Sequence, residues 1–450
     1  MKKLIYTVST VICLVVTIQT FAQESSKDFK YRRSSLAMIL IESDNFPNKD
    51  AVMSSWNNYP FPDKYNKHSI DLKSININSI ELSEQDLLNA GFLKDTLKDP
   101  LQIAKATGSL KPVKYLNAEQ TIAVVMPTEK QEYQLKIDKF INDNKLANML
   151  VATWFNRSAD GKFDMSLIQE RGFYNASELE ASIAKGQTKG LASLGDAGEE
   201  LIRNTFVTFT KLEFIENEPI AALVRDVTKA EIAESMAGKP QILIDKALQA
   251  ADVTYEKTKE GYSLWSKTWL YRLNWNDSIA SIFYNDLWSN PSAFDKSDLF
   301  SLEFVGVQYN QSLVTFKIGE SRTQEQLIDL ALVRNVDNAF AELQKDNDVF
   351  KPKVPVLTVN PITAQIGMKE GLKGGESFDV LEMTLNPKTG LTEYKKVGSA
   401  TADKKIIWDN RYNAGEKVEQ VLDKDGNPIT ATHFKGGKSI QPGMLLKQVK

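Results

Sequence analysis

The sequence predicts an α/β (or α+β) body with a mixed sheet, followed by a small all-β C-terminal domain that is a barrel or a sandwich. Three observations carry this prediction. Apolar runs typical of strands alternate with stretches of helical periodicity up to about residue 350. Two prolines, Pro352 and Pro355, then interrupt the chain. Beyond them the sequence consists of short β-prone segments separated by turn residues.

Residues 23–120 are expected to form an N-terminal α/β segment. The apolar run at 35–41 has no polar alternation, as in a strand buried on both faces. A loop-rich stretch follows, with a short helix over residues 49–56. Ser83 suits the start of another helix because its hydroxyl can accept hydrogen bonds from first-turn amides.

Residues 121–350 are expected to form the main α/β domain. A β-prone run at 205–210 follows a helix of small residues, which favours a sheet with helices packed on it. The other elements expected here are a strand at 122–126, helices near 133–142, 144–154, from Ser177 and over 194–203, a capped helix at 276–287, strands within 301–317 and a long amphipathic helix at 323–344.

The clearest strand covers residues 264–275, where large apolar and polar residues alternate with period two. One face of it carries four large aromatic residues: Trp265, Trp269, Tyr271 and Trp275. If they are exposed, these side chains can stack on sugars or contact a partner, whereas an apolar strand face is more often part of a core. They are the candidate ligand or partner surface.

The segment 351–355 is expected to be a linker, and residues 356–450 a small β domain. Short strands are predicted at 356–359, 378–384 and 406–408, and a hairpin at 423–427.

The N-terminus predicts export. Lys2 and Lys3 precede an apolar run that ends in small Ala22, the layout of a cleavable signal peptide covering residues 1–22. The alternative is an uncleaved anchor, which basic residues after the run keep open. Cys13 lies inside the run, so we expect no lipid anchor built on it. The protein is expected in the periplasm or outside the cell, with no membrane span after cleavage.

Composition narrows the classes of function. Removing Lys2 and Lys3 from 55 basic residues leaves 53 against 58 acidic ones, a net charge of −5, which argues against nucleic acid as a partner. Without Cys13 the chain has no cysteine, and therefore no disulfide, thiol nucleophile or cysteine metal site.

No catalytic, cofactor-binding or metal-binding residues are predicted. The chain has two histidines, His68 and His433, which we expect at the surface or in loops because a triad or metal site needs convergent partners. The motifs H-E-x-x-H, G-x-S-x-G and G-x-G-x-x-G do not occur. A pair of carboxylates for glycoside cleavage stays open, since only separation in space identifies one.

Two segments resemble known families of envelope proteins. Residues 364–380, with Gly367, Gly371, Gly374 and Gly375 before Phe378, resemble the opening of the small β-barrel that ends flagellar-assembly-T-like proteins. Residues 163–172 and 194–209 resemble the α/β unit of curli-secretion and TolB N-terminal-type domains. The whole chain resembles uncharacterised secreted or periplasmic proteins of Gram-negative bacteria, and the resemblance implies location rather than activity.

We therefore expect a non-catalytic exported cell-envelope protein that acts as an interaction or assembly module, with one or more envelope proteins as partners and no cofactor. The alternative is a secreted protein that binds or hydrolyses glycans, either through the aromatic stripe or through an unidentified Asp/Glu pair.

Overall fold

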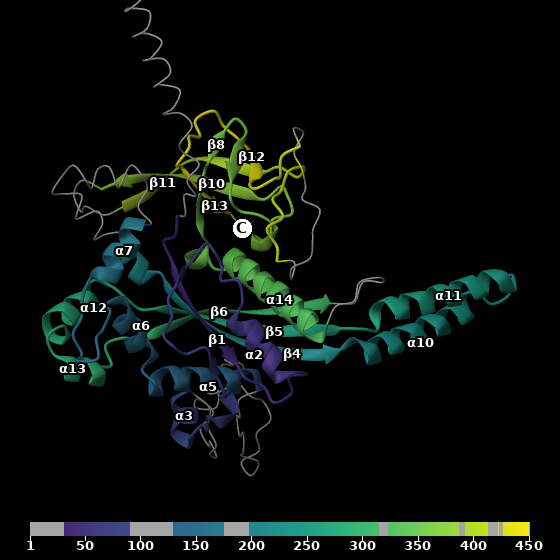
Figure 1. The fold of residues 1–450 in the computed structure, drawn as a ribbon, viewed down its shortest axis with the longest axis horizontal. Helices are drawn as coiled ribbons and strands as arrows, with labels where there is room; N and C mark the ends of the chain where they lie inside the picture. Colours follow the sequence, from purple (N-terminus) through teal and green to yellow (C-terminus); the bar gives the residue numbers. More distant parts are fainter. Residues whose placement is uncertain are drawn as a thin grey trace, which may run out of the picture.

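The computed structural model describes residues 31–90, 129–174, 198–314, 323–386, 392–412, 422 and 426–449. The expected signal peptide, the strand at 122–126 and the helix from Ser177 lie outside these residues. The described elements form two sheets, sheet A with helices on both faces and sheet B in the C-terminal part (Figure 1).

Sheet A is a mixed six-stranded sheet with the order β2-β1-β4-β5-β6. The sixth strand, β3, also pairs with β1, at the opposite end of β1 from β2. The pairs β4–β5 and β5–β6 are antiparallel, whereas β1 is parallel to β2, β3 and β4. The strand bounds are β1 (Ser35–Ile41), β2 (Asn66–Lys67), β3 (Ser74–Ile75), β4 (Thr205–Glu216), β5 (Tyr262–Leu273) and β6 (Leu302–Val314).

The apolar run at 35–41 is β1, an inner strand of this sheet that lies between β2 and β4. All seven of its residues pair with β4, from Ser35 opposite Thr205 to Ile41 opposite Lys211. Leu36 and Leu40 pack on one face of the sheet, and Ile39 packs on the other. The strand is therefore covered on both sides, as its continuous apolar sequence predicts.

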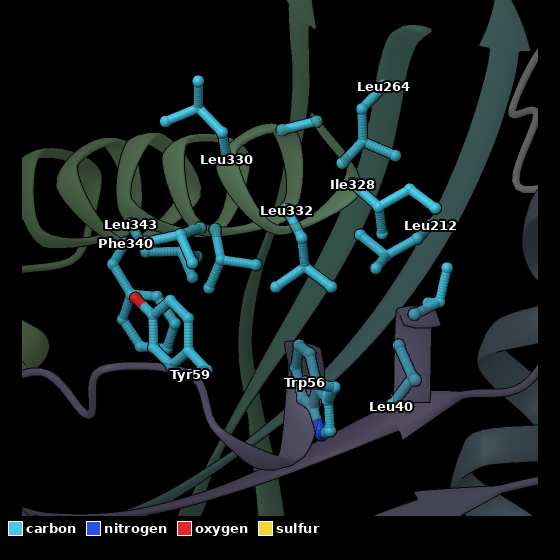
Figure 2. Close-up of a cluster of buried hydrophobic side chains, with 14 of the residues drawn as sticks. Leu40, Trp56, Tyr59, Leu212, Leu264, Ile328, Leu330, Leu332, Phe340 and Leu343 are labelled. Carbon is cyan, nitrogen blue, oxygen red and sulfur yellow. The ribbon is translucent and has the colours of Figure 1, made fainter. Parts of the chain in front are cut away.

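Helix α14 (Gln324–Asp346) covers one face of sheet A together with α2 (Lys49–Asn57). The Thr323 hydroxyl accepts from the Gln326 amide at 3.3 Å, and the Gln326 side chain accepts from the Thr323 amide at 3.0 Å, which closes a capping box. Leu332 of α14 points toward Trp56 of α2 (Figure 2).

Other helices cover the opposite face and one end of the sheet. Ile137 and Leu150 pack against Trp269 of β5. A second cluster, rich in aromatic residues, gathers around Phe155 and Phe283. The helices are α3 (Glu84–Asn89), α5 (Glu129–Asp143), α6 (Leu146–Trp154), α7 (Ser166–Tyr174), α12 (Asp277–Ile282), the π-helix η2 (Phe283–Leu287) and α13 (Pro291–Lys296); short 3₁₀ turns are η1 (Ile77–Ser79), η3 (Asp348–Phe350) and η4 (Met368–Glu370).

Sheet B is all-antiparallel and curls into a half-barrel, in the order β7-β13-β10-β11-β12-β9-β8. Gly374 lies at a corner where no other residue fits, because its φ is +96° and a Cβ would lie 2.5 Å from the Lys404 Cα. The strands are β7 (Lys353–Pro355), β8 (Thr358–Val359), β9 (Ile362–Ala364), β10 (Ser377–Leu385), β11 (Thr392–Ala402), β12 (Thr432–Gly436) and β13 (Leu445–Gln448).

The chain passes from α14 to sheet B through the segment expected to be a linker. Lys353–Pro355 is strand β7, paired with β13, and Lys351 is buried. Glu200 ties the two parts together, since it accepts hydrogen bonds from the Lys353 Nζ at 3.0 Å and from the Tyr394 hydroxyl at 2.7 Å.

Both parts of the predicted fold, an α/β body with a mixed sheet and a β-rich C-terminal part, are thus present. The segment 406–408 contributes an isolated bridge between Trp408 and Gly367. At the hairpin expected at 423–427, Leu422 and Pro428 bridge antiparallel, while residues 423–425 lie outside the described part. No helix among the described residues is long and apolar enough to cross a membrane.

Candidate functional site

Two long helices, α10 (Asn217–Ser235) and α11 (Gln241–Thr258), project together from one end of sheet A (Figure 1). They are inserted between the neighbouring strands β4 and β5. At 1.5 Å rise per residue, the 19 residues of α10 give a length of about 28 Å. We call residues 217–258 the arm, and its two ends the base, next to the sheet, and the tip.

The tip is a tight turn built by two residues with special backbone preferences. Gly238 has a φ of +82°, and no heavy atom lies within 4 Å of the position of its Cβ. Pro240 occupies the N-cap of α11, where the absence of an N–H costs nothing. This turn reverses the chain, so α10 and α11 lie antiparallel.

The base of the arm is fixed to β5 by Asn217. Its backbone N–H donates to the Gly261 carbonyl at 3.1 Å, and its Nδ2 donates to the Glu260 carbonyl at 3.1 Å. Its Oδ1 accepts from the buried Ser263 hydroxyl at 2.9 Å. These contacts hold the start of α10 against the end of α11, so the arm leaves the sheet in a defined direction.

Few side chains are fully buried between α10 and α11, although Ile232, Ile244 and Leu248 are half-buried. Ala221 and Ala251 are the buried residues of the two helices beyond Asn217. Lys229 pairs with Asp252 at 2.5 Å, and the Arg225 guanidinium lies 4.4 Å from the centre of the Tyr255 ring. The exposed ion pair adds about 1 kcal/mol or less to this contact.

Seven large apolar residues of the arm are exposed. Leu223 and Ile242 are each 65 % exposed. The other large apolar residues exposed on the arm are Ile220, Val224, Val227, Leu243 and Val253. An amphipathic helix normally turns its large apolar side chains toward its neighbour, whereas α10 and α11 also carry large apolar side chains on their outer sides.

Covering these side chains would release appreciable free energy. Full burial of a side chain of this size is worth about 1.5–3 kcal/mol. With about half of each of the seven exposed, their burial would contribute on the order of 5–10 kcal/mol. This is comparable with the estimated cost of about 4–15 kcal/mol for fixing two proteins together, so the arm has the character of a contact surface.

The aromatic stripe of β5 is divided by the fold. Trp269 and Tyr271 are buried under α5, where the Tyr271 hydroxyl donates to Asp138 at 2.6 Å. Trp275 lies two residues after the end of β5 and is also buried. Trp265 is 48 % exposed. In this conformation, Trp265 is the one residue of the four that a ligand or partner can reach.

A second exposed aromatic residue accompanies Trp265. Tyr309 of β6, opposite Lys267, is 53 % exposed and lies on the same face of the sheet. The Lys267 Nζ lies 4.3 Å from the centre of the Trp269 ring and 5.3 Å from that of Tyr309. This end of the sheet face therefore presents two exposed aromatic side chains, one of which, Tyr309, has a cation beside its ring.

His68 lies in a loop, as expected, but it is fully buried rather than at the surface. Its Nδ1 lies 3.0 Å from the Nη1 atom of Arg171, and its Nε2 lies 2.9 Å from the Leu150 carbonyl oxygen. Since Arg171 can only donate, Nδ1 accepts and Nε2 donates. Burial and the Arg171 charge lower the pKa of His68 to about 3, so this histidine is neutral and structural. His433 lies half-buried in β12.

Two small cavities lie beside buried polar side chains. A cavity of about 70 Å³ beside His68 is lined by no acidic residue and is small compared with ligand pockets of about 300–1,000 Å³. A second cavity, of about 10 Å³, lies beside the buried carboxyls of Asp337 and Glu370. Asp337 lies 3.7 Å from Lys369, and Glu370 accepts from the Gly367 amide at 2.8 Å, so both carboxyls have structural partners.

Neither a metal site nor a similarity to a known protein family adds a further candidate site. Across the described ranges of the chain, no group of three or more His, Cys, Asp or Glu residues could hold a metal ion. No protein-family model matches the chain, and no curated protein matches it significantly. The arm, and the exposed aromatic pair beside it, are therefore the features on which a function can be argued.

The sequence analysis did not identify the arm. The sequence does contain a pattern typical of the arm. Its apolar residues at 220, 223, 224 and 227 follow helical spacing, and Gly238 with Pro240 marks the turn between the helices. That spacing predicts a face buried within the fold, and only the structure shows that the face is exposed.

Proposed function

We propose that this chain is a non-catalytic exported cell-envelope protein that acts as an interaction or assembly module, and that the arm is its contact surface. The observation that carries the proposal is the exposure of seven large apolar side chains on two helices that project from the sheet. The expected signal peptide supports the location in the periplasm or outside the cell.

Photo-crosslinking from the arm tests this proposal. With p-benzoylphenylalanine in place of Leu223, irradiation of cells or envelope fractions should give an adduct of one defined mass. The matched control carries the same group in place of Glu342, an exposed residue of α14 on the body. Equal adduct from both positions, or none from Leu223, would argue against the arm as a contact surface.

The location has a separate test, because contact and export are independent parts of the proposal. N-terminal sequencing of protein recovered from the periplasm or medium should begin after Ala22. Recovery of the intact N-terminus in a membrane fraction would favour the uncleaved anchor instead.

Glycan binding is the second candidate function, and the exposure of Trp265 and Tyr309 on neighbouring strands favours it. Aromatic faces stack on sugar rings, and Lys267 beside them can donate hydrogen bonds to hydroxyl groups. Binding of soluble envelope polysaccharide should then be lost in Trp265→Ala and kept in Phe304→Ala, which removes another exposed aromatic residue of sheet A. Equal binding by both variants would exclude this surface.

A further inference from the structure

Strand β6 is the long edge strand of sheet A. It ends the order β2-β1-β4-β5-β6, contains 13 residues and pairs with β5 along one side. Across the described ranges of the chain, no backbone hydrogen bond joins residues 302–314 to any element other than β5. In an antiparallel pair, alternate residues turn both N–H and C=O away from the partner strand. The outer side of β6 therefore presents these groups from about six residues.

The other edge strands of the two sheets are short. Strands β2 and β8 have two residues each, and β7 has three. Proteins usually protect a long edge strand with lysine, proline or a covering element, because an open edge pairs readily with other strands. The β6 sequence contains no lysine or proline, and Glu303 is its one charged residue. Its composition is therefore typical of a strand that accepts a further strand.

Solvent reaches the outer side of β6. Phe304 is 46 % exposed and Tyr309 is 53 % exposed. Tyr271, which lies opposite Phe304 on the inner strand β5, is buried. Gly306, which has no side chain, is itself partly exposed, so its backbone is accessible. A strand added beside β6 would cover part of both exposed aromatic rings.

The backbone of this edge determines the chemistry of its occupant. A row of N–H and C=O groups at strand spacing is fully paired only by another extended backbone. We propose that β6 accepts an extended segment of another protein, which adds to sheet A as a further strand. The edge shares no residue with the arm, so this inference goes beyond the proposed function and adds a second contact surface.

The two faces of β6 specify the side chains that the segment carries. Phe304, Val307 and Tyr309 lie on the face that α5 covers further inward. Gln308 lies on the opposite face, where its side chain donates to Asp346 of α14. Because successive residues of a strand point to opposite faces, the segment should alternate apolar residues toward the first face with polar residues toward the second.

Charge favours a basic segment over a second copy of this chain. Asp346 is exposed and, in the part of the chain that the structure describes, forms no ion pair. Glu303 differs, since it lies opposite Arg272 of β5. If β6 paired antiparallel with β6 of a second copy, both Asp346 carboxylates would lie on the same face of the joined sheet. A lysine or arginine of the inserted segment would instead meet Asp346 as an opposite charge.

A synthetic peptide tests the proposal with the full chain. The probe is a short fluorescein-labelled peptide that alternates lysine and valine, and the control is the same peptide methylated on every backbone nitrogen. Fluorescence anisotropy should show saturable binding of the probe, at least about tenfold tighter than that of the control. Methylation removes the backbone donors and keeps the side chains and the charge, so the difference reports strand pairing.

Two lysine substitutions at exposed positions locate the contact. Tyr309→Lys places a charge on the edge strand and should weaken binding of the probe at least about tenfold. The matched variant Trp265→Lys places the same charge on the same face of the inner strand β5, and it should bind within about threefold of the original. Hydrogen exchange should slow at residues 306–312 when the probe is bound, because outward amides then gain partners.

Each other outcome overturns a stated part of the proposal. Equal binding of both peptides would overturn strand addition, because charge and side chains alone would then explain the binding. Equal loss in both lysine variants, or no saturable binding of the probe, would overturn β6 as the site. Sedimentation of the full chain as a dimer that Tyr309→Lys dissociates would make a second copy the occupant. None of these results bears on the photo-adduct from Leu223, so failure here is distinct from failure of the arm.

Discussion

Asp337 offers a quantitative test of how the body and sheet B are joined. Its carboxyl on α14 is buried, accepts a hydrogen bond from the Tyr59 hydroxyl at 2.6 Å and lies 3.7 Å from the Lys369 Nζ. Burial outweighs the attraction of Lys369 and raises the pKa of Asp337 to about 6. The side chain therefore keeps its proton in the folded protein at pH values where the unfolded chain has lost it.

The sign of the pH dependence follows from this shift. The unfolded pKa is near 3.8, so between pH 4 and 6 the folded state binds more protons than the unfolded state. The free energy of unfolding should therefore fall as pH rises through this window and stay low above pH 6. A shift of about two units corresponds to roughly 3 kcal/mol.

The substitution Asp337→Asn removes the titration and retains an oxygen that can accept from Tyr59. Urea denaturation of both proteins between pH 4 and 7.5 should show the stability difference, variant minus wild type, rising by roughly 3 kcal/mol across the window. Taking the difference cancels groups common to both proteins. Glu342→Gln, an exposed site on the same helix, serves as the control.

A flat difference for Asp337→Asn would refute the reasoning, because it would mean that Asp337 ionises in the folded protein as it does in the unfolded chain. A difference that falls with rising pH would mean that the attraction of Lys369 exceeds the cost of burial.

Three other substitutions have expected effects on stability that urea denaturation would measure. His68→Phe should lower the free energy of unfolding by about 2 kcal/mol at pH 7.5, because two buried hydrogen bonds are lost. This loss should shrink below pH 6.5, because the unfolded chain then binds a proton at His68 while the folded protein, where the pKa of His68 is about 3, does not. A loss that stays constant with pH would contradict this. Trp269→Ala should cost about 3–5 kcal/mol and Trp265→Ala less than about 1 kcal/mol, and equal costs would contradict the burial of the stripe. Gly374→Ala should cost more than about 1 kcal/mol, whereas Gly437→Ala, whose Cβ would have room, should be nearly neutral.

Elements with strong local patterns could be predicted from the sequence. The apolar run at 35–41 is β1, the alternating run at 264–275 corresponds to β5 (Tyr262–Leu273), and the helix expected at 323–344 is α14 (Gln324–Asp346). For α14, the periodicity of the apolar residues matches the buried face. For β5 it does not fully match, because Ser266 and Thr268 of the polar face are buried whereas Trp265 of the apolar face is exposed. The capping role of Thr323 is likewise local, because the residues that form the box are three apart.

Long-range relations could not be predicted in this way. The parallel pairing of β1 with β4 joins residues about 170 positions apart, and no local pattern specifies it. The burial of His68 depends on Arg171 and Leu150, which come from distant helices. Whether Trp265 is covered depends on how far α5 extends over the sheet. These features arise from packing between elements and not from the pattern within any one element.

The position of β1 also affects the order in which the chain can fold. This strand is an early part of the described chain, yet its neighbour β4 and the covering helix α14 are made much later. Contacts at such sequence separation slow folding, because the loop must close before the contact forms. During synthesis, the N-terminal part thus has no complete core to join until α14 has emerged. For a chain that we propose leaves the cytoplasm through a secretion channel, this delay keeps it unfolded and transportable for longer.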